Sequence, residues 1–175
     1  MAANDNECAH AIPSADRSAA NTEAEPALAT LSFGAQFVIW SARAWVTALK
    51  LDRPFEEVSC GVFVKLDLVP AQASLHALFT IVARDAARQI DIRCLNCPRV
   101  SADESLLRCA VAAAQTEDPF AAYDALRNWL PPAAARLALR SLNDYAGELA
   151  ARSLRLQPDP AGHVRRPLLS SAALH

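Results

Sequence analysis

Glycine is scarce in this sequence, with four residues in 175. Phosphate-binding loops and dinucleotide-binding fingerprints need several glycines within a short stretch, and no such cluster occurs. The common nucleotide-binding motifs are therefore excluded. Alanine is abundant instead, with 38 residues. Because alanine costs least in a helix and glycine costs far more, the composition favours helices over sheets.

An excess of positive charge is also missing. The formal net charge is −2, and the 17 basic residues are spread along the chain. Nucleic acids and anionic membrane surfaces attract basic patches, so we expect neither as a partner. Fifteen of the basic residues are arginine. This bias, together with the alanine content, is typical of proteins from bacteria with GC-rich genomes.

No uninterrupted run of 18 or more apolar residues occurs. The best candidate is the segment 28–49, which Gln36, Ser41 and Arg43 interrupt. As a helix, this segment is apolar around nearly all of its circumference, which is typical of a core helix or of a membrane span. The interruptions favour the central helix of a soluble bundle.

A secretory signal is not recognisable at the start of the sequence. The first thirty residues carry five acidic side chains instead of a basic region followed by an apolar one. We therefore expect a cytoplasmic protein. The five cysteines are an odd number, which in this setting predicts no disulfide framework.

Helical patterns fill the middle of the chain. We expect an all-α fold, a single compact bundle of five to six helices over residues 27–155, with disordered tails at 1–26 and 156–175. Pro54, Val69-Pro70 and Pro131-Pro132 punctuate this region. The expected helices cover about 27–50, a stretch from Pro54, about 70–89, a stretch from Ser101, a stretch from Asp118, and about 133–155.

Two helix starts carry specific capping signals. Ser101-Ala102-Asp103-Glu104 is a capping box, in which Ser101 accepts from the amide of Glu104 and Glu104 reaches back to the amide of Ser101. Asp118-Pro119 supplies a capping carboxylate followed by proline at the first helical position. Before the first of these starts, residues 90–95 alternate apolar and polar side chains, which predicts an extended segment. Whether that segment pairs with another strand is left open.

The sharpest local motif is Cys94-Leu95-Asn96-Cys97. A Cys-x-x-Cys pair is typical of a redox site or of half a zinc site. A redox pair usually lies at a helix N-terminus, but the capping Ser101 follows Cys97 by four residues.

A zinc site needs two further ligands, which only the tertiary fold would bring to Cys94 and Cys97 from Cys109, Cys60 or His76. The simpler interpretation is that Cys60 and Cys109 are small buried hydrophobic residues. Cys94 and Cys97 are then incidental loop thiols. If the pair instead binds a metal, zinc is the candidate.

A catalytic constellation is not apparent. His76 is the histidine expected in the folded part, and no serine or cysteine is placed as its nucleophilic partner. We therefore favour a non-enzymatic role, as a helical interaction or regulatory protein that binds a protein partner or forms a homodimer through an apolar face. The alternative is a metal- or redox-responsive protein that uses Cys94 and Cys97.

The segment from Cys97 to Leu107, after three apolar helices and before two alanine- and leucine-rich ones, resembles a group of small uncharacterised all-helical proteins from proteobacteria. The resemblance covers roughly residues 30–155. It implies a cytoplasmic helical domain without an assigned activity, and it assigns no functional residue.

Overall fold

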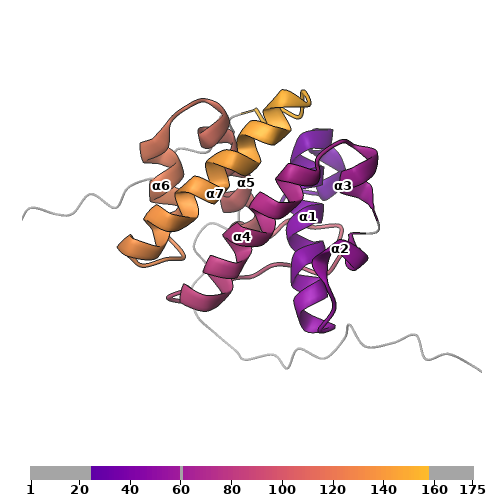
Figure 1. Ribbon diagram of the computed structural model, residues 1–175, viewed down its shortest axis with the longest axis horizontal. Coiled ribbons are helices and arrows are strands. Elements are labelled where there is room, and N and C mark those ends of the chain that lie inside the picture. The colour runs from indigo at the N-terminus through magenta and orange to yellow at the C-terminus, as the bar shows by residue number, and fades with distance from the viewer. Residues whose placement is uncertain (1–24, 60, 158–175) are drawn as a thin grey trace, which may run out of the picture.

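The computed structural model describes residues 25–59 and 61–157, and over these residues the predicted all-α fold is confirmed. The described part contains no strand, and its α-helices fall into the six expected regions (Figure 1). Their bounds are α1 Phe33–Lys50, α2 Phe55–Val58, α3 Val62–Lys65, α4 Val69–Asp85, α5 Ala102–Gln115, α6 Pro119–Arg127 and α7 Pro132–Ala151.

Helices α4 and α7 pack side by side, and the others flank them (Figure 1). Helices α5 and α6 contact each other and α7, whereas α2 contacts α1, and α3 contacts α4. Helix α1 contacts both α4 and α5, and so links the two flanks. One continuous apolar core runs through all of these contacts and includes Phe63, Leu75, Leu107, Leu142 and Leu149, which are all 0% exposed.

Helix α1 buries eleven of its eighteen residues. Ser32 caps its N-terminus, and the Ser32 hydroxyl accepts from the amide of Ala35 at 3.4 Å. The expected start near residue 27 was therefore too early. Leu28–Thr30 forms a separate 3₁₀ turn, and Ala27 makes an isolated antiparallel bridge with Arg99. This bridge attaches the residues before α1 to the loop before α5.

The helix expected from Pro54 divides into α2 and α3. Gly61, which precedes α3, has φ +67°, a left-handed conformation that glycine adopts without the steric cost of a side chain. Helix α4 ends at Asp85, four residues before the expected end, and the Ala87 amide then donates to the carbonyl of Trp129 at 2.8 Å. Helix α7 likewise ends at Ala151 rather than near 155.

Both ends of the described chain are hydrogen-bonded to the rest of the fold. The Val100 amide donates to the carbonyl of Pro26 at 3.0 Å, and the Leu156 amide donates to Gln115 Oε1 at 2.7 Å. Pro26 and Leu156 fall within the ranges 1–26 and 156–175, which the sequence predicted to be disordered tails. The remainder of those ranges, 1–24 and 158–175, lies outside the described residues. Among the helices that are described, none combines the length and hydrophobicity that a membrane crossing requires.

Candidate functional site

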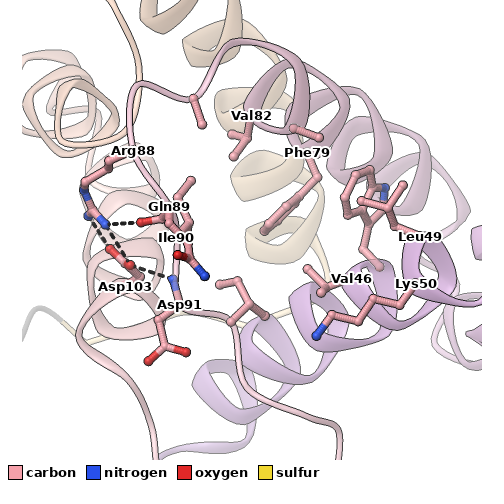
Figure 2. A pocket seen from close by; sticks show the side chains of 14 residues that line it. Val46, Leu49, Lys50, Phe79, Val82, Arg88, Gln89, Ile90, Asp91 and Asp103 are labelled. Carbon is pink, nitrogen blue, oxygen red and sulfur yellow. Dashed lines mark hydrogen bonds and ion pairs between the residues drawn. The ribbon is translucent and has the colours of Figure 1, made fainter. Parts of the chain in front are cut away.

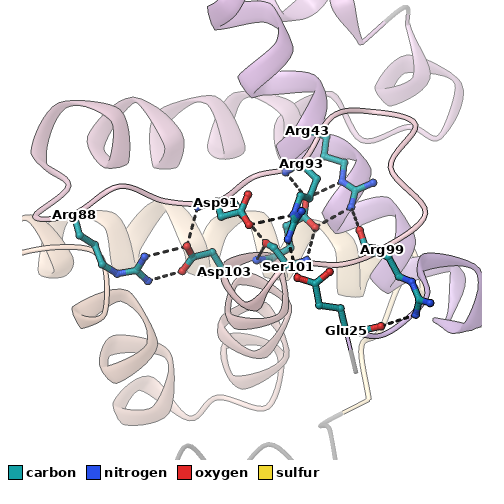
Figure 3. A network of polar contacts seen from close by, with 9 residues as sticks. Glu25, Arg43, Arg88, Asp91, Arg93, Arg99, Ser101 and Asp103 are labelled. Atoms are coloured by element: carbon teal, nitrogen blue, oxygen red, sulfur yellow. Dashed lines mark hydrogen bonds and ion pairs between the residues drawn. The ribbon is translucent and has the colours of Figure 1, made fainter. Parts of the chain in front are cut away.

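The segment 86–101 connects α4 to α5 and passes in front of the N-terminus of α5 (Figure 3). Its main chain is held there by side chains of α5. The Asp91 amide donates to Asp103 Oδ2 at 2.8 Å, and the Arg93 amide donates to Glu104 Oε1 at 3.0 Å. The Ser101 hydroxyl donates to the carbonyl of Asp91 at 2.5 Å. Alternate residues of the segment therefore direct their main chain toward α5.

This alternation shows that residues 90–93 are extended, as the sequence predicts. The Arg93 Nε atom lies 3.1 Å from Asp91 Oδ2, so these two side chains share one face of the segment. Ile90 and Ile92 lie on the other face and line a cleft. Within the described residues, no hydrogen bond involves the main-chain groups of Ile90 or Ile92. The segment is thus strand-like in its extended main chain but is not part of a sheet: one edge is hydrogen-bonded to side chains of α5, and the opposite edge is unpaired. It is called the strand below.

A buried ion pair fixes the loop after this strand. Arg43 on α1 and Glu104 on α5 both have side chains that are 0% exposed, and Arg43 Nε lies 2.7 Å from Glu104 Oε1. Arg43 also donates to the carbonyls of Cys97 at 2.6 Å and Arg99 at 2.7 Å. The hydrogen bond with Glu104 raises the pKa of Arg43, although burial opposes this rise. Arg43 therefore stays charged and joins α1, α5 and the loop.

Asp103 is the second carboxylate that holds the segment. It forms an ion pair with Arg88, and its Oδ1 atom accepts from Trp129 Nε1 at 2.9 Å. Burial tends to raise the pKa of Asp103, but the hydrogen bonds from Arg88, the Asp91 amide and Trp129 outweigh it, so the pKa lies below its ordinary value. The carboxylate is thus ionised and satisfied at neutral pH.

The cleft beside the strand has a volume of about 680 Å³. Its walls come from the C-terminal halves of α1 and α4 and from residues 86–92 (Figure 2). The apolar lining includes Val46, Leu49, Phe79, Val82, Ile90 and Ile92. Lys50 extends from α1 toward the strand, and within the described residues its ammonium has no ion-pair partner. The cleft therefore combines apolar walls, one uncompensated cation and an unpaired strand edge.

Cys94 and Cys97, the candidate ligands from the sequence, lie at the first and last positions of a turn. The Cys97 amide donates to the carbonyl of Cys94 at 3.1 Å. Within the described residues, no group of three or more potential ligands is placed to hold a metal ion. Cys60, named as a further ligand, lies outside the described residues, and Cys109 is half-buried on α5. The pair itself supplies two thiols.

Other named residues have structural partners. His76 is exposed and accepts from Trp45 Nε1 at 3.2 Å through Nδ1. The capping box at Ser101 and the cap at Asp118 are both confirmed. In the sequence, Arg43 is only a polar interruption of an apolar helix, and no pattern assigns a role to Lys50. The position of Arg43 in the middle of an apolar stripe could have indicated a buried ion pair, because a buried charge needs a partner.

Comparison with known proteins gave no match to a family model, a curated protein or a solved structure. The resemblance to small helical proteobacterial proteins stays a prediction.

Proposed function

We propose that this protein is a non-catalytic binding module that takes an extended segment of a partner protein into the cleft between α1, α4 and residues 86–92. The observation that carries the proposal is the unpaired edge at Ile90 and Ile92, which faces away from α5. Exposed strand edges bind extended peptides by adding a strand, and main-chain hydrogen bonds then supply affinity.

The apolar walls supply the side-chain part of this recognition. A peptide paired with Ile90 and Ile92 places alternate side chains on the cleft face, because side chains alternate along a strand. Val46, Phe79 and Val82 are available to contact those side chains. The expected ligand therefore alternates apolar residues toward the cleft with polar residues toward solvent.

The charges of the cleft favour an acidic partner. Arg88 is paired with Asp103, and Arg93 lies between Asp91 and Glu25, so both of these arginines already have carboxylate partners. Lys50 is left as the cation that a ligand carboxylate would meet. We therefore propose a segment with an aspartate or glutamate next to its apolar positions. We place this interaction in the cytoplasm, the location that the sequence predicts.

The non-catalytic role rests on how the polar side chains are used. Glu104 and Asp103, the buried carboxylates of the site, each accept from main-chain amides and from an arginine. Such groups hold the strand in place and have little capacity left for proton transfer to a substrate. The same arrangement supports a rigid binding edge.

The test is a selection of random peptides displayed on phage against the purified full-length protein, followed by affinity measurement on the selected synthetic peptide. We expect a sequence of alternating apolar residues with a neighbouring acidic residue. Lys50→Glu should weaken its binding by about tenfold, since one charge pair becomes a repulsion. The matched control is Leu137→Glu on α7, at an exposed apolar position away from the cleft, which should leave affinity unchanged.

Two substitutions at Ile92 test whether main-chain hydrogen bonds contribute to peptide binding. Ile92→Pro removes an amide that donates no hydrogen bond within the described structure, whereas Ile92→Val keeps the amide and an apolar side chain. We expect Ile92→Pro to weaken binding by about tenfold or more and Ile92→Val to change it little. Equal losses in both variants, selected peptides that are helical when bound, or a homodimer formed through this cleft would contradict strand addition.

A further inference from the structure

The turn that follows the strand brings two thiols together. Cys94 is exposed and Cys97 is half-buried, and the hydrogen bond from the Cys97 amide to the Cys94 carbonyl closes a four-residue turn. The first and last Cα atoms of such a turn lie within about 7 Å. A disulfide spans Cα separations of about 4.4–6.8 Å. The turn therefore brings the Cα atoms of Cys94 and Cys97 close to the separation that a disulfide bond needs.

The turn is anchored on both sides. Before it, the Arg93 amide donates to Glu104 Oε1, and after it, Arg43 donates to the carbonyl of Cys97. Both anchors belong to the fully buried ion pair between α1 and α5. Because the flanking main chain is already ordered, closing a bond between the two thiols loses little additional conformational freedom.

We propose that Cys94 and Cys97 form a reversible intramolecular disulfide by exchange with a small-molecule disulfide of the oxidised glutathione class. This modification site is separate from the peptide-binding cleft and does not depend on it. The proposed bond begins two residues beyond Ile92, so oxidation would cross-link the turn that follows the binding strand.

The exchange balances in two steps. The thiolate of the exposed Cys94 attacks one sulfur of oxidised glutathione, the glutathione disulfide breaks, and one glutathione thiolate leaves. The thiolate of Cys97 then attacks the Cys94 sulfur of the mixed disulfide and releases the second glutathione thiolate. The protein loses two electrons, oxidised glutathione gains two, and the two protons from the cysteines pass to the two glutathione molecules.

The test incubates the full-length protein, without denaturant, in buffers of defined reduced and oxidised glutathione. Thiols are then alkylated and the peptides are mapped by mass. We expect the peptide with Cys94 and Cys97 to lack two hydrogens and both alkyl groups, and excess reduced glutathione to reverse this. In Cys97→Ser, a glutathione mixed disulfide should persist on Cys94, because no second thiol releases it.

A variant with altered spacing tests whether disulfide formation depends on the turn or only on the closeness of the two cysteines in the sequence. Insertion of one glycine between Leu95 and Asn96 keeps both cysteines but breaks the turn, and its helical content can be checked by circular dichroism. We expect the equilibrium constant for disulfide formation to fall by about tenfold or more. An unchanged constant would overturn the proposal. So would a mixed disulfide that accumulates on Cys94 in the wild type, or a bond from Cys94 to another cysteine.

Discussion

Helices α5 and α6 each have a carboxylate in the cap that accepts from a main-chain amide, yet the two carboxylates have different roles. At α6, Asp118 is exposed and accepts from the amide of Ala121 at 2.9 Å, a contact within its own first turn. At α5, Glu104 completes the capping box and is fully buried, where it also binds Arg43 and the Arg93 amide. A cap at the surface stabilises one helix end. A buried cap joins several elements that are far apart in sequence.

We expect the largest loss of stability from a substitution at Glu104. Glu104→Gln keeps the shape of the side chain but leaves the buried Arg43 without a compensating charge. We expect the free energy of unfolding to fall by about 3–5 kcal/mol, as measured by urea denaturation. A loss below about 1 kcal/mol would show that the buried pair does not hold the two helices and the loop together.

The second effect concerns Asp103, which is also in the first turn of α5 but pairs with the more exposed Arg88. Asp103→Asn weakens the hydrogen bonds to Arg88 and Trp129, and we expect a loss of about 1–3 kcal/mol at neutral pH. Since folding lowers the pKa of Asp103, its stabilisation is complete above the unfolded value near pH 4 and is lost as pH falls through the folded value.

Urea denaturation of wild type and Asp103→Asn at a series of pH values checks this. The difference in unfolding free energy between them should shrink as pH falls below about 4. A difference that stays constant over this range would assign the loss to packing rather than to the ionised carboxylate.

A smaller effect is expected at the local cap. Asp118→Ala removes the oxygen that accepts from the Ala121 amide, and no other element depends on this side chain within the described structure. We expect a loss of about 1 kcal/mol, measured as before. If this substitution proved as damaging as Glu104→Gln, the distinction between a local cap and a joining cap would be wrong.

Gly147 on α7 is remote from both caps. We expect a substitution there to give the smallest change in stability, and to raise it rather than lower it. A Cβ added at Gly147 would meet nothing within 4 Å, so close packing does not require a glycine there. Gly147→Ala should therefore raise the free energy of unfolding by about 0.5–1 kcal/mol, since alanine is the better helix former. A destabilised variant would show that the glycine has a role that this packing does not reveal.

Much of the fold follows from local sequence signals. The capping box at Ser101 and the Asp118-Pro119 pair correctly locate the first residues of α5 and α6. Boundaries were less accurate where tertiary contacts decide them. The bridge between Ala27 and Arg99 and the hydrogen bond from Ala87 to Trp129 both join distant segments, and the helix ends beside them differ from the expected ones.

The site was less predictable, because its residues meet only in the fold. Arg43 and Glu104 are 61 positions apart, and Lys50 faces Ile90 and Ile92 across the cleft. The alternation at 90–95 predicted an extended segment, and residues 90–93 are extended, whereas Cys94 already begins a turn. Nothing local showed that its partners would be side chains of α5 rather than another strand.

Amide hydrogen exchange measured by NMR on the ligand-free protein is the most direct test of the half-paired strand on which the proposed function depends. We predict slow exchange at the amides of Asp91 and Arg93, which are bound by Asp103 and Glu104, and fast exchange at Ile90 and Ile92. On addition of a selected peptide, Ile90 and Ile92 should become protected. Protection at all four amides in the free protein, or at none, would contradict the open edge.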